Sequence, residues 1–200
     1  ALHYLPGVED ARLFAEHCGF ARLFEGVRQY EHAAARHRHA RLRIGYLSPD
    51  FAMQINAFFI MALLAHRTKE RFDIYCYDTR GANDSVTQQM RSLADAWRDV
   101  AALSAEERAA RIYADEIDIL FDLSGHTDGG HGLATLGYKA APVQLTGIGY
   151  MSTSGLKAVD YCLSDIFLDP EGKGDAYFSE KLLRLPHSHF CYTPFEAVFK

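Results

Sequence analysis

The stretch from residue 41 to residue 65 constrains the fold more than any other part of the chain. Residues 41–48 are rich in β-favouring apolar side chains, and Pro49 ends the run because proline cannot donate to a sheet ladder. Residues 57–65 are apolar on every face and too short to cross a bilayer, which predicts a buried helix. Strand, turn and buried helix predict the start of a βαβ unit, in which ligands bind at the carboxyl ends of the strands. We therefore expect chemistry between residues 48 and 56.

The same alternation of strand and helix continues along the chain. Further strands are expected at residues 71–78, 97–101, 117–123, 143–148, 159–163 and 182–185, and further helices at residues 88–96, 104–114 and 133–139. Before them, apolar residues at three- and four-residue steps predict a helix over residues 10–39, with a solvated polar tail from residue 31. The pattern predicts an α/β fold, a doubly wound Rossmann-like parallel sheet with right-handed crossovers, preceded by a helical segment.

Composition excludes several classes of protein. A net charge of -5 and a pI near 6.0, without a basic stripe, disfavour nucleic acid as a partner. No apolar run approaches the length of a membrane span, and the first residues lack the pattern of a signal peptide. Four cysteines lie far apart without CxxC spacing, which predicts free thiols in a reducing compartment, with the cytoplasm as the default location.

Three loops are expected to leave strands at one edge of the parallel sheet, at residues 48–56, 124–132 and 149–155. Their side chains that can donate or exchange protons are Asp50, His126, Asp128, His131, Tyr150, Ser152, Thr153 and Ser154. Together these loops predict a cleft for a hydroxyl-rich ligand, uncharged or phosphate-bearing, held by backbone amides and hydroxyl groups.

Two common nucleotide motifs are absent. The first strand leads into Ser-Pro-Asp-Phe instead of G-x-G-x-x-G, which argues against a dehydrogenase, and the chain has no Walker phosphate loop. Asp50 follows a proline at a helix entry, so the residue pattern leaves two roles open for it: capping the helix or taking part in catalysis.

No metal site is expected from the sequence. His37 and His39 have no cysteine, aspartate or glutamate nearby at ligand spacing, and His126, Asp128 and His131 lie at irregular spacing on a glycine-rich loop.

A series of motifs, in order along the chain, carries a family resemblance. They are residues 41–51 (RLRIGYLSPDF), 122–127 (DLSGHT), 141–144 (APVQ), 148–150 (IGY) with 153–155 (TSG), 160–161 (DY), 177–182 (YFSEKL) and 184–186 (RLP) with 191–194 (CYTP). Together they resemble the amino-terminal catalytic lobe of glycosyltransferase family 41, the family of O-GlcNAc transferase and SPINDLY-type enzymes. On this resemblance residues 1–40 are a helical linker from a tetratricopeptide repeat region, and residues 41–200 are the Rossmann-like first lobe.

The resemblance implies a two-lobed GT-B enzyme that transfers a sugar from a nucleotide donor to Ser or Thr of proteins, with inversion and without a metal. UDP-GlcNAc or GDP-fucose is the implied donor, bound as substrate, and no cofactor is implied. In the family a second lobe binds the nucleotide. We therefore expect this chain alone to be inactive, and to work with that missing lobe or as a homo-oligomer.

Residue roles also follow from the resemblance. Asp50 matches the aspartate of the S-x-D-F motif, considered as a proton acceptor, while Gln54 stands at a catalytic position where the family has a histidine. The residues implied to bind the donor are Asn56, His126, Thr127, Ile148, Gly149, Tyr150 and Thr153.

Departures from the family pattern keep a non-enzymatic alternative open. Glutamine at position 54 cannot act as a base, residues 151–152 are Met-Ser instead of Pro-Gly, and a second family histidine is expected at about Ala1 or before it. The alternatives are a catalytically degenerate lobe that acts as a binding or scaffold module, and an unrelated small-molecule-binding Rossmann domain. His126 and residues 191–194 favour the SPINDLY-like side of the family.

Overall fold

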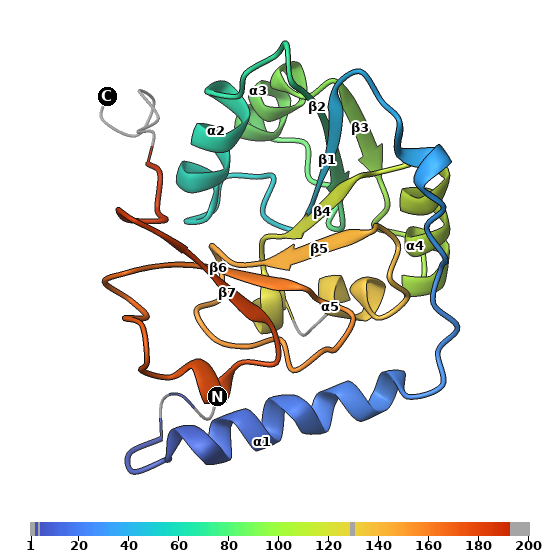
Figure 1. Ribbon diagram of the computed structural model, residues 1–200. Helices are drawn as coiled ribbons and strands as arrows, with labels where there is room; N and C mark the ends of the chain where they lie inside the picture. Colours follow the sequence, from blue (N-terminus) through green and yellow to red (C-terminus); the bar gives the residue numbers. More distant parts are fainter. Residues whose placement is uncertain (1–2, 4, 129–130, 193–200) are drawn as a thin grey trace.

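The computed structural model describes residues 3, 5–128 and 131–192, apart from the side chain of Asp128. Its centre is a parallel sheet in the order β3-β2-β1-β4-β5-β6-β7 (Figure 1). The strands are β1 (Leu42–Ser48), β2 (Phe72–Asp78), β3 (Ala96–Asp99), β4 (Ile119–Asp122), β5 (Val143–Thr146), β6 (Tyr161–Asp165) and β7 (Lys181–Leu185). The predicted α/β fold is confirmed, and the strand order reverses direction between β1 and β4.

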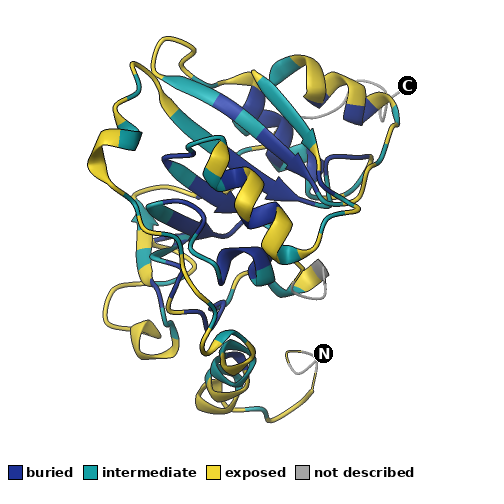
Figure 2. Cartoon of the chain, turned by 90° about the vertical axis from the view of Figure 1, so that its right-hand side faces the viewer, coloured by how far each residue is buried: buried dark blue, intermediate teal, exposed yellow. Residues whose placement is uncertain are grey.

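Helices cover both faces of the sheet. They are α1 (Asp10–Ala21), α2 (Ala57–Ala65), α3 (Ser85–Leu93), α4 (Ala105–Ala114) and α5 (His131–Leu136), with short 3-10 helices η2 (Arg22–Phe24), η3 (Ala34–His37), η4 (Gly125–Asp128) and η5 (Asp175–Tyr177). Successive strand residues point to opposite layers: Tyr46 packs with α2 and α3, whereas Leu47 packs with α4 and α5. Figure 2 shows the buried sheet between helices whose outer faces are exposed. Burial on both faces explains the apolar strands.

Two helix signals in the sequence match the structure. Ala57–Ala65 is helical as predicted, and its apolar side chains are covered on two sides. Ile60 and Leu64 pack in the core beside the sheet, and the ring centroids of Phe59 and Phe190 are 5.0 Å apart. Ser104 and Glu107 form the predicted capping box at the start of α4.

The predicted helix over residues 10–39 is too long. The α-helix ends at Ala21, and Gly26, with a φ of +88°, turns the chain into an extended segment. This segment is only partly solvated, because Tyr30 stacks on Tyr113 of α4 with ring centroids 4.2 Å apart. Figure 1 shows it running past α4 to β1. Among the described helices, none has the length and apolar character that crossing a membrane requires.

The carboxylate of Asp165, at the end of β6, accepts four hydrogen bonds. They come from the backbone N–H groups of His189 (2.9 Å), Leu168 (2.8 Å) and Phe167 (2.9 Å), and from the His189 ring (2.6 Å). These donors, led by the His189 backbone N–H, hold the pKa of Asp165 well below its usual range.

A depressed folded-state pKa stabilises the fold above the unfolded-state pKa of about 4, and this contribution is lost as pH falls toward the folded-state pKa. Asp165→Asn should therefore lower the melting temperature near pH 6, and the difference from wild type should shrink below about pH 4. Thermal unfolding across this range is the measurement, with Glu171→Gln, an exposed site, as control. A difference that does not change with pH would contradict the role of this carboxylate.

Candidate functional site

The three loops predicted to share one edge of the sheet meet in the structure. Ser48 Oγ, at the end of β1, lies 3.2 Å from Ser124 Oγ, after β4. The N–H of Gly149, after β5, donates to the carbonyl of Leu123 at 3.1 Å. The β1 and β4 loops flank the point where the strand order reverses, which is where open α/β sheets bind ligands.

Asp50 is held in place by its neighbours. Its N–H donates to Ser48 Oγ (3.0 Å), its Oδ2 accepts from Asn56 Nδ2 (2.7 Å), and its Oδ1 lies 3.9 Å from the Arg80 guanidinium. The N-cap of α2 is Asn56, which makes no side-chain cap bond. The interpretation of Asp50 as a helix cap is therefore wrong.

A polar pocket of about 350 Å³ opens at this edge. It is lined by Pro49, Asp50, Asn56, Thr79, Arg80, Thr127 and His131. Three of the residues implied by the resemblance thus share one pocket: Asp50, Asn56 and Thr127. The sequence reasoning missed Thr79 and Arg80, although their loop follows β2 and so leaves the sheet at the same edge. Gln54 is half-buried before α2, where its carbonyl accepts from the Ala57 N–H at 3.1 Å, and it is not among the described lining residues.

The loop after β5 has a strained backbone. Ile148 is buried with a φ of +69°, and the N–H of Gly149 donates to the carbonyl of Gly147 at 2.9 Å, so Ile148 is the centre of a γ-turn. A β-branched residue at positive φ is rare, and such strain concentrates at functional sites. A Cβ at Gly149 would lie 2.4 Å from the Leu123 carbonyl oxygen and 2.8 Å from Asn56 Nδ2. Only glycine lets this loop touch both neighbours.

Two histidines from the start of the chain bind the hydroxyl of Tyr150. His17 Nδ1 is 2.5 Å from the carbonyl of Leu13, which can only accept, so Nδ1 carries the proton and Nε2 accepts from the Tyr150 hydroxyl at 2.6 Å. His3 Nε2 lies 2.8 Å from the same oxygen, whose proton goes to His17, so His3 donates. The expected position of the second family histidine, Ala1, lies outside the described residues.

His126 lies beside Tyr150, with ring centroids 5.3 Å apart. Its Nε2 lies 3.0 Å from the carbonyl of Ser154, and its ring packs edge-on against His17 and Phe20, each with centroids 4.9 Å away. Helix α1, expected to be part of a linker, thus contacts Tyr150 and His126, two predicted donor-binding residues that are not among the described residues lining the polar pocket. The sequence did carry a signal: His17 interrupts the apolar stripe of α1, where a polar side chain needs a partner.

His17→Phe tests this contact. The ring volume is kept, but the acceptor for Tyr150 is lost, so we expect a loss of about 1 kcal/mol in the free energy of unfolding. A double-mutant cycle with Tyr150→Phe, measured by urea unfolding, should give a coupling energy of about 1 kcal/mol between the two residues. Strictly additive effects would show that the bond does not contribute.

Thr153 is buried in a hydrogen-bond network inside the lobe. Its side chain is fully buried, and its hydroxyl donates to Glu180 Oε2 at 2.6 Å. Glu180 also accepts from the Ser154 N–H at 2.8 Å and thereby ties the loop after β5 to β7. A contact between Thr153 and a donor stays a prediction. The expectation that His126, Asp128 and His131 do not bind a metal also stays untested, since the Asp128 side chain lies outside the described residues.

A parallel doubly wound sheet with a carboxylate, an arginine and hydroxyl groups at its switch point defines a Rossmann-like ligand-binding lobe. Within that class, the chain belongs to a particular family, glycosyl transferase family 41, whose model matches residues 22–197.

Named relatives and a solved structure agree with this assignment. The chain is 32% identical over 202 residues to the probable UDP-N-acetylglucosamine–peptide N-acetylglucosaminyltransferase SPINDLY of Solanum lycopersicum, covering 97% of this chain and 21% of that protein. It is 32% identical over 190 residues to the SEC protein of Arabidopsis thaliana, covering 92% and 19%. A mutant of the O-GlcNAc transferase of Thermobaculum terrenum superposes with a TM-score of 0.89 at 31% identity, over 98% of this chain and 38% of that one. The chain thus spans about a fifth of the length of these curated relatives.

Proposed function

We propose that this chain is the amino-terminal catalytic lobe of an inverting protein O-glycosyltransferase, which transfers GlcNAc or fucose from a nucleotide sugar to Ser or Thr of proteins. The observation that carries the proposal is the match to family 41, in a fold that places Asp50 in a pocket at the switch point. The relatives are named as N-acetylglucosaminyltransferases acting on peptides, which supports a protein acceptor and UDP-GlcNAc as the first donor to test.

The pocket offers groups suited to this reaction. The acceptor hydroxyl attacks the anomeric carbon, its proton passes to the Asp50 carboxylate, and the bond from that carbon to the diphosphate oxygen breaks. Arg80, which lines the same pocket, supplies positive charge near the departing diphosphate. The Gly149 loop and Tyr150 orient the sugar. The rest of the nucleotide site belongs to a second lobe, and no step requires a metal ion, a cofactor or nucleic acid. The four free thiols support a cytoplasmic location.

Gln54 is the reason to keep the degenerate lobe as a second candidate. It stands at the position where the resemblance implies a histidine, and an amide side chain cannot carry a proton at neutral pH. In that case the same pocket would serve as a binding or scaffold module.

Sugar transfer is the test. The full-length gene product is incubated with protein acceptors, EDTA and either UDP-GlcNAc or GDP-fucose, and modified Ser or Thr residues are identified by mass spectrometry. We expect transfer from one donor, with release of its nucleoside diphosphate. A folded protein that transfers from neither donor, and gains nothing from Gln54→His, would refute the enzymatic proposal in favour of the degenerate lobe.

A further inference from the structure

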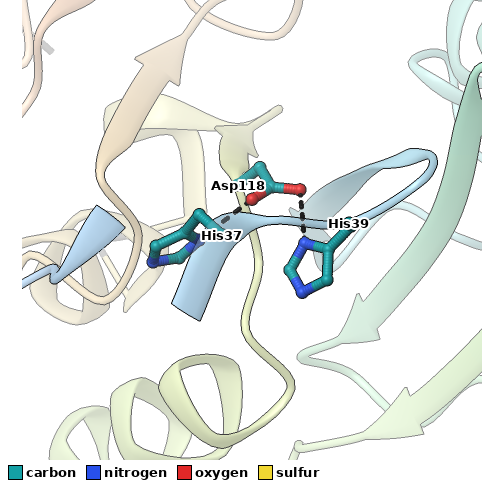
Figure 3. A group of neighbouring side chains, drawn as sticks. All are labelled: His37, His39 and Asp118. Atoms are coloured by element: carbon teal, nitrogen blue, oxygen red, sulfur yellow. Dashed lines mark hydrogen bonds and ion pairs between the residues drawn. The ribbon is translucent and has the colours of Figure 1, made fainter. Parts of the chain in front are cut away.

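His37, His39 and Asp118 come together at the amino edge of the sheet (Figure 3). His37 Nδ1 lies 2.9 Å from Asp118 Oδ1, and His39 Nδ1 lies 2.9 Å from Asp118 Oδ2. His37 ends η3, His39 precedes β1, and Asp118 precedes β4, so the cluster lies at the opposite end of the strands from the candidate active site. The sequence has no carboxylate at ligand spacing beside the two histidines, but the fold brings Asp118 to them from 79 residues away.

The cluster is largely removed from solvent. The side chain of Asp118 is 6% exposed, and those of His37 and His39 are 14% and 12% exposed. The Arg43 N–H donates to Asp118 Oδ2 at 2.8 Å and fixes the orientation of the carboxylate. A buried carboxylate is costly unless positive charge or several hydrogen bonds compensate it.

The neighbouring arginines do not supply that charge. The Arg43 guanidinium donates to the Asp115 carbonyl (3.0 Å) and lies 3.4 Å from Glu116 Oε2, while that of Arg36 lies 3.7 Å from Glu116 Oε1. Among the ion pairs found in the described residues, those of Asp118 are to the two imidazoles alone. The described donors to this buried carboxylate are the two imidazoles and the Arg43 N–H, and a divalent cation held between the three side chains would replace the imidazole protons with positive charge.

The donor set suits a divalent transition metal. Two imidazole nitrogens and one carboxylate oxygen, with a water as fourth ligand, form a tetrahedral site typical of zinc. The three ligand atoms lie within 4.8 Å of one another. Ligands about 2.0–2.1 Å from a tetrahedral zinc are about 3.3 Å apart. The two observed nitrogen–oxygen separations of 2.9 Å run to different oxygens of Asp118, and all three ligand atoms lie within 4.8 Å, so side-chain rotations must bring the three atoms to this spacing.

The Glu116 carboxylate lies next to the second ring nitrogen of His39. His39 Nε2 lies 3.3 Å from Glu116 Oε2. A histidine that binds a metal through one nitrogen usually donates its other ring N–H to a carboxylate, which fixes the tautomer. With the proton on Nε2, the Nδ1 lone pair of His39 is free for the ion.

We propose that His37 Nδ1, His39 Nδ1 and the Asp118 carboxylate bind one zinc ion. Each imidazole binds the ion through the Nδ1 lone pair and carries its ring proton on Nε2. The site joins the segment before β1 to the segment before β4. It thereby fastens the extended segment that follows α1 to the lobe, and it takes no part in sugar transfer.

The test uses the untagged chain, freed of metal with EDTA. Zn²⁺ is titrated by calorimetry, and Co²⁺ is followed by the visible absorption of tetrahedral cobalt. We expect one ion per chain with a micromolar or lower Kd, and a rise in melting temperature of about 5 °C at saturation. His37→Gln and His39→Gln should each weaken binding at least about tenfold, whereas His187→Gln, which removes an exposed imidazole elsewhere, should bind like wild type.

Circular dichroism confirms that each variant is folded. Glu116→Gln leaves all three ligands in place and should lower affinity by about tenfold. The proposal is overturned if the folded wild-type chain shows no calorimetric signal and no melting shift at tenfold excess of Zn²⁺. It is equally overturned if His37→Gln and His39→Gln bind Zn²⁺ as wild type does.

Discussion

Asp50→Asn in the full-length protein should lower kcat for sugar transfer about 100- to 10,000-fold, the usual contribution of a positioned general base. The carboxylate is held by Asn56 and faces the pocket that Arg80 also lines, so it is preorganised to accept the proton of an acceptor hydroxyl. An amide keeps the shape and loses the base. The KM for the donor should change little, because the proton transfer occurs after the donor is bound.

The matched control for this substitution is Asp73→Asn. Asp73 lies near the start of β2, at the amino edge, where its carboxylate is paired with Arg41 at 2.6 Å. This variant removes the same charge away from the pocket and should keep the wild-type kcat. Transfer rates measured at saturating donor decide the matter: an Asp50→Asn enzyme within about threefold of wild type would rule out Asp50 as the base.

Gly149→Ala should damage both stability and activity. The added Cβ would lie 2.4 Å from the Leu123 carbonyl oxygen, and a backbone atom in a strand connection cannot move aside easily. The loop after β5 must shift away from β4, and the same Cβ, 2.8 Å from Asn56 Nδ2, pushes the amide that donates to Asp50. We expect a loss of about 1–3 kcal/mol in the free energy of unfolding. The KM for the donor should rise as well, since the resemblance places this loop on the sugar.

Gly19→Ala is the control for the glycine substitution. Gly19 lies inside α1 with no atom within 4 Å of an added Cβ, so alanine there should stabilise the fold by about 0.5–1 kcal/mol. Urea unfolding of both variants compares the same chemical change in a crowded loop and in an open helix position. Equal effects at the two sites would contradict the tight contact between the β4 and β5 loops.

Local sequence patterns were sufficient for the sheet. Runs such as residues 42–48 and 72–78 are apolar because both faces are covered, and parallel strands then place the loops after β1, β4 and β5 at one edge without knowledge of any contact. Helix ends were less predictable. The apolar residues at three- and four-residue steps suggested a helix to residue 39, but Gly26 adopts a left-handed conformation in a turn that depends on packing.

Contacts between distant segments could not be predicted from one sequence. His17 meets Tyr150 across 133 residues, and His37 meets Asp118 across 81 residues. Neither pairing leaves a local pattern, because each depends on where the chain before β1 lies on the lobe. The position of Arg80 could have been predicted. Its loop follows β2, which ends at the same edge of the sheet as β1, β4 and β5 because the strands are parallel.

The central claim, that this lobe forms one wall of a donor site shared with a second lobe, is tested most directly by calorimetric titration. The 200-residue chain and the full-length protein are titrated in parallel with UDP, GDP, UDP-GlcNAc and GDP-fucose. We predict micromolar binding of one nucleotide and its sugar to the full-length protein, and binding to the chain alone that is at least about 100-fold weaker, a loss of about 2.7 kcal/mol. Equally tight binding to the chain alone would mean that these residues hold a complete nucleotide site, and would contradict the shared-site account.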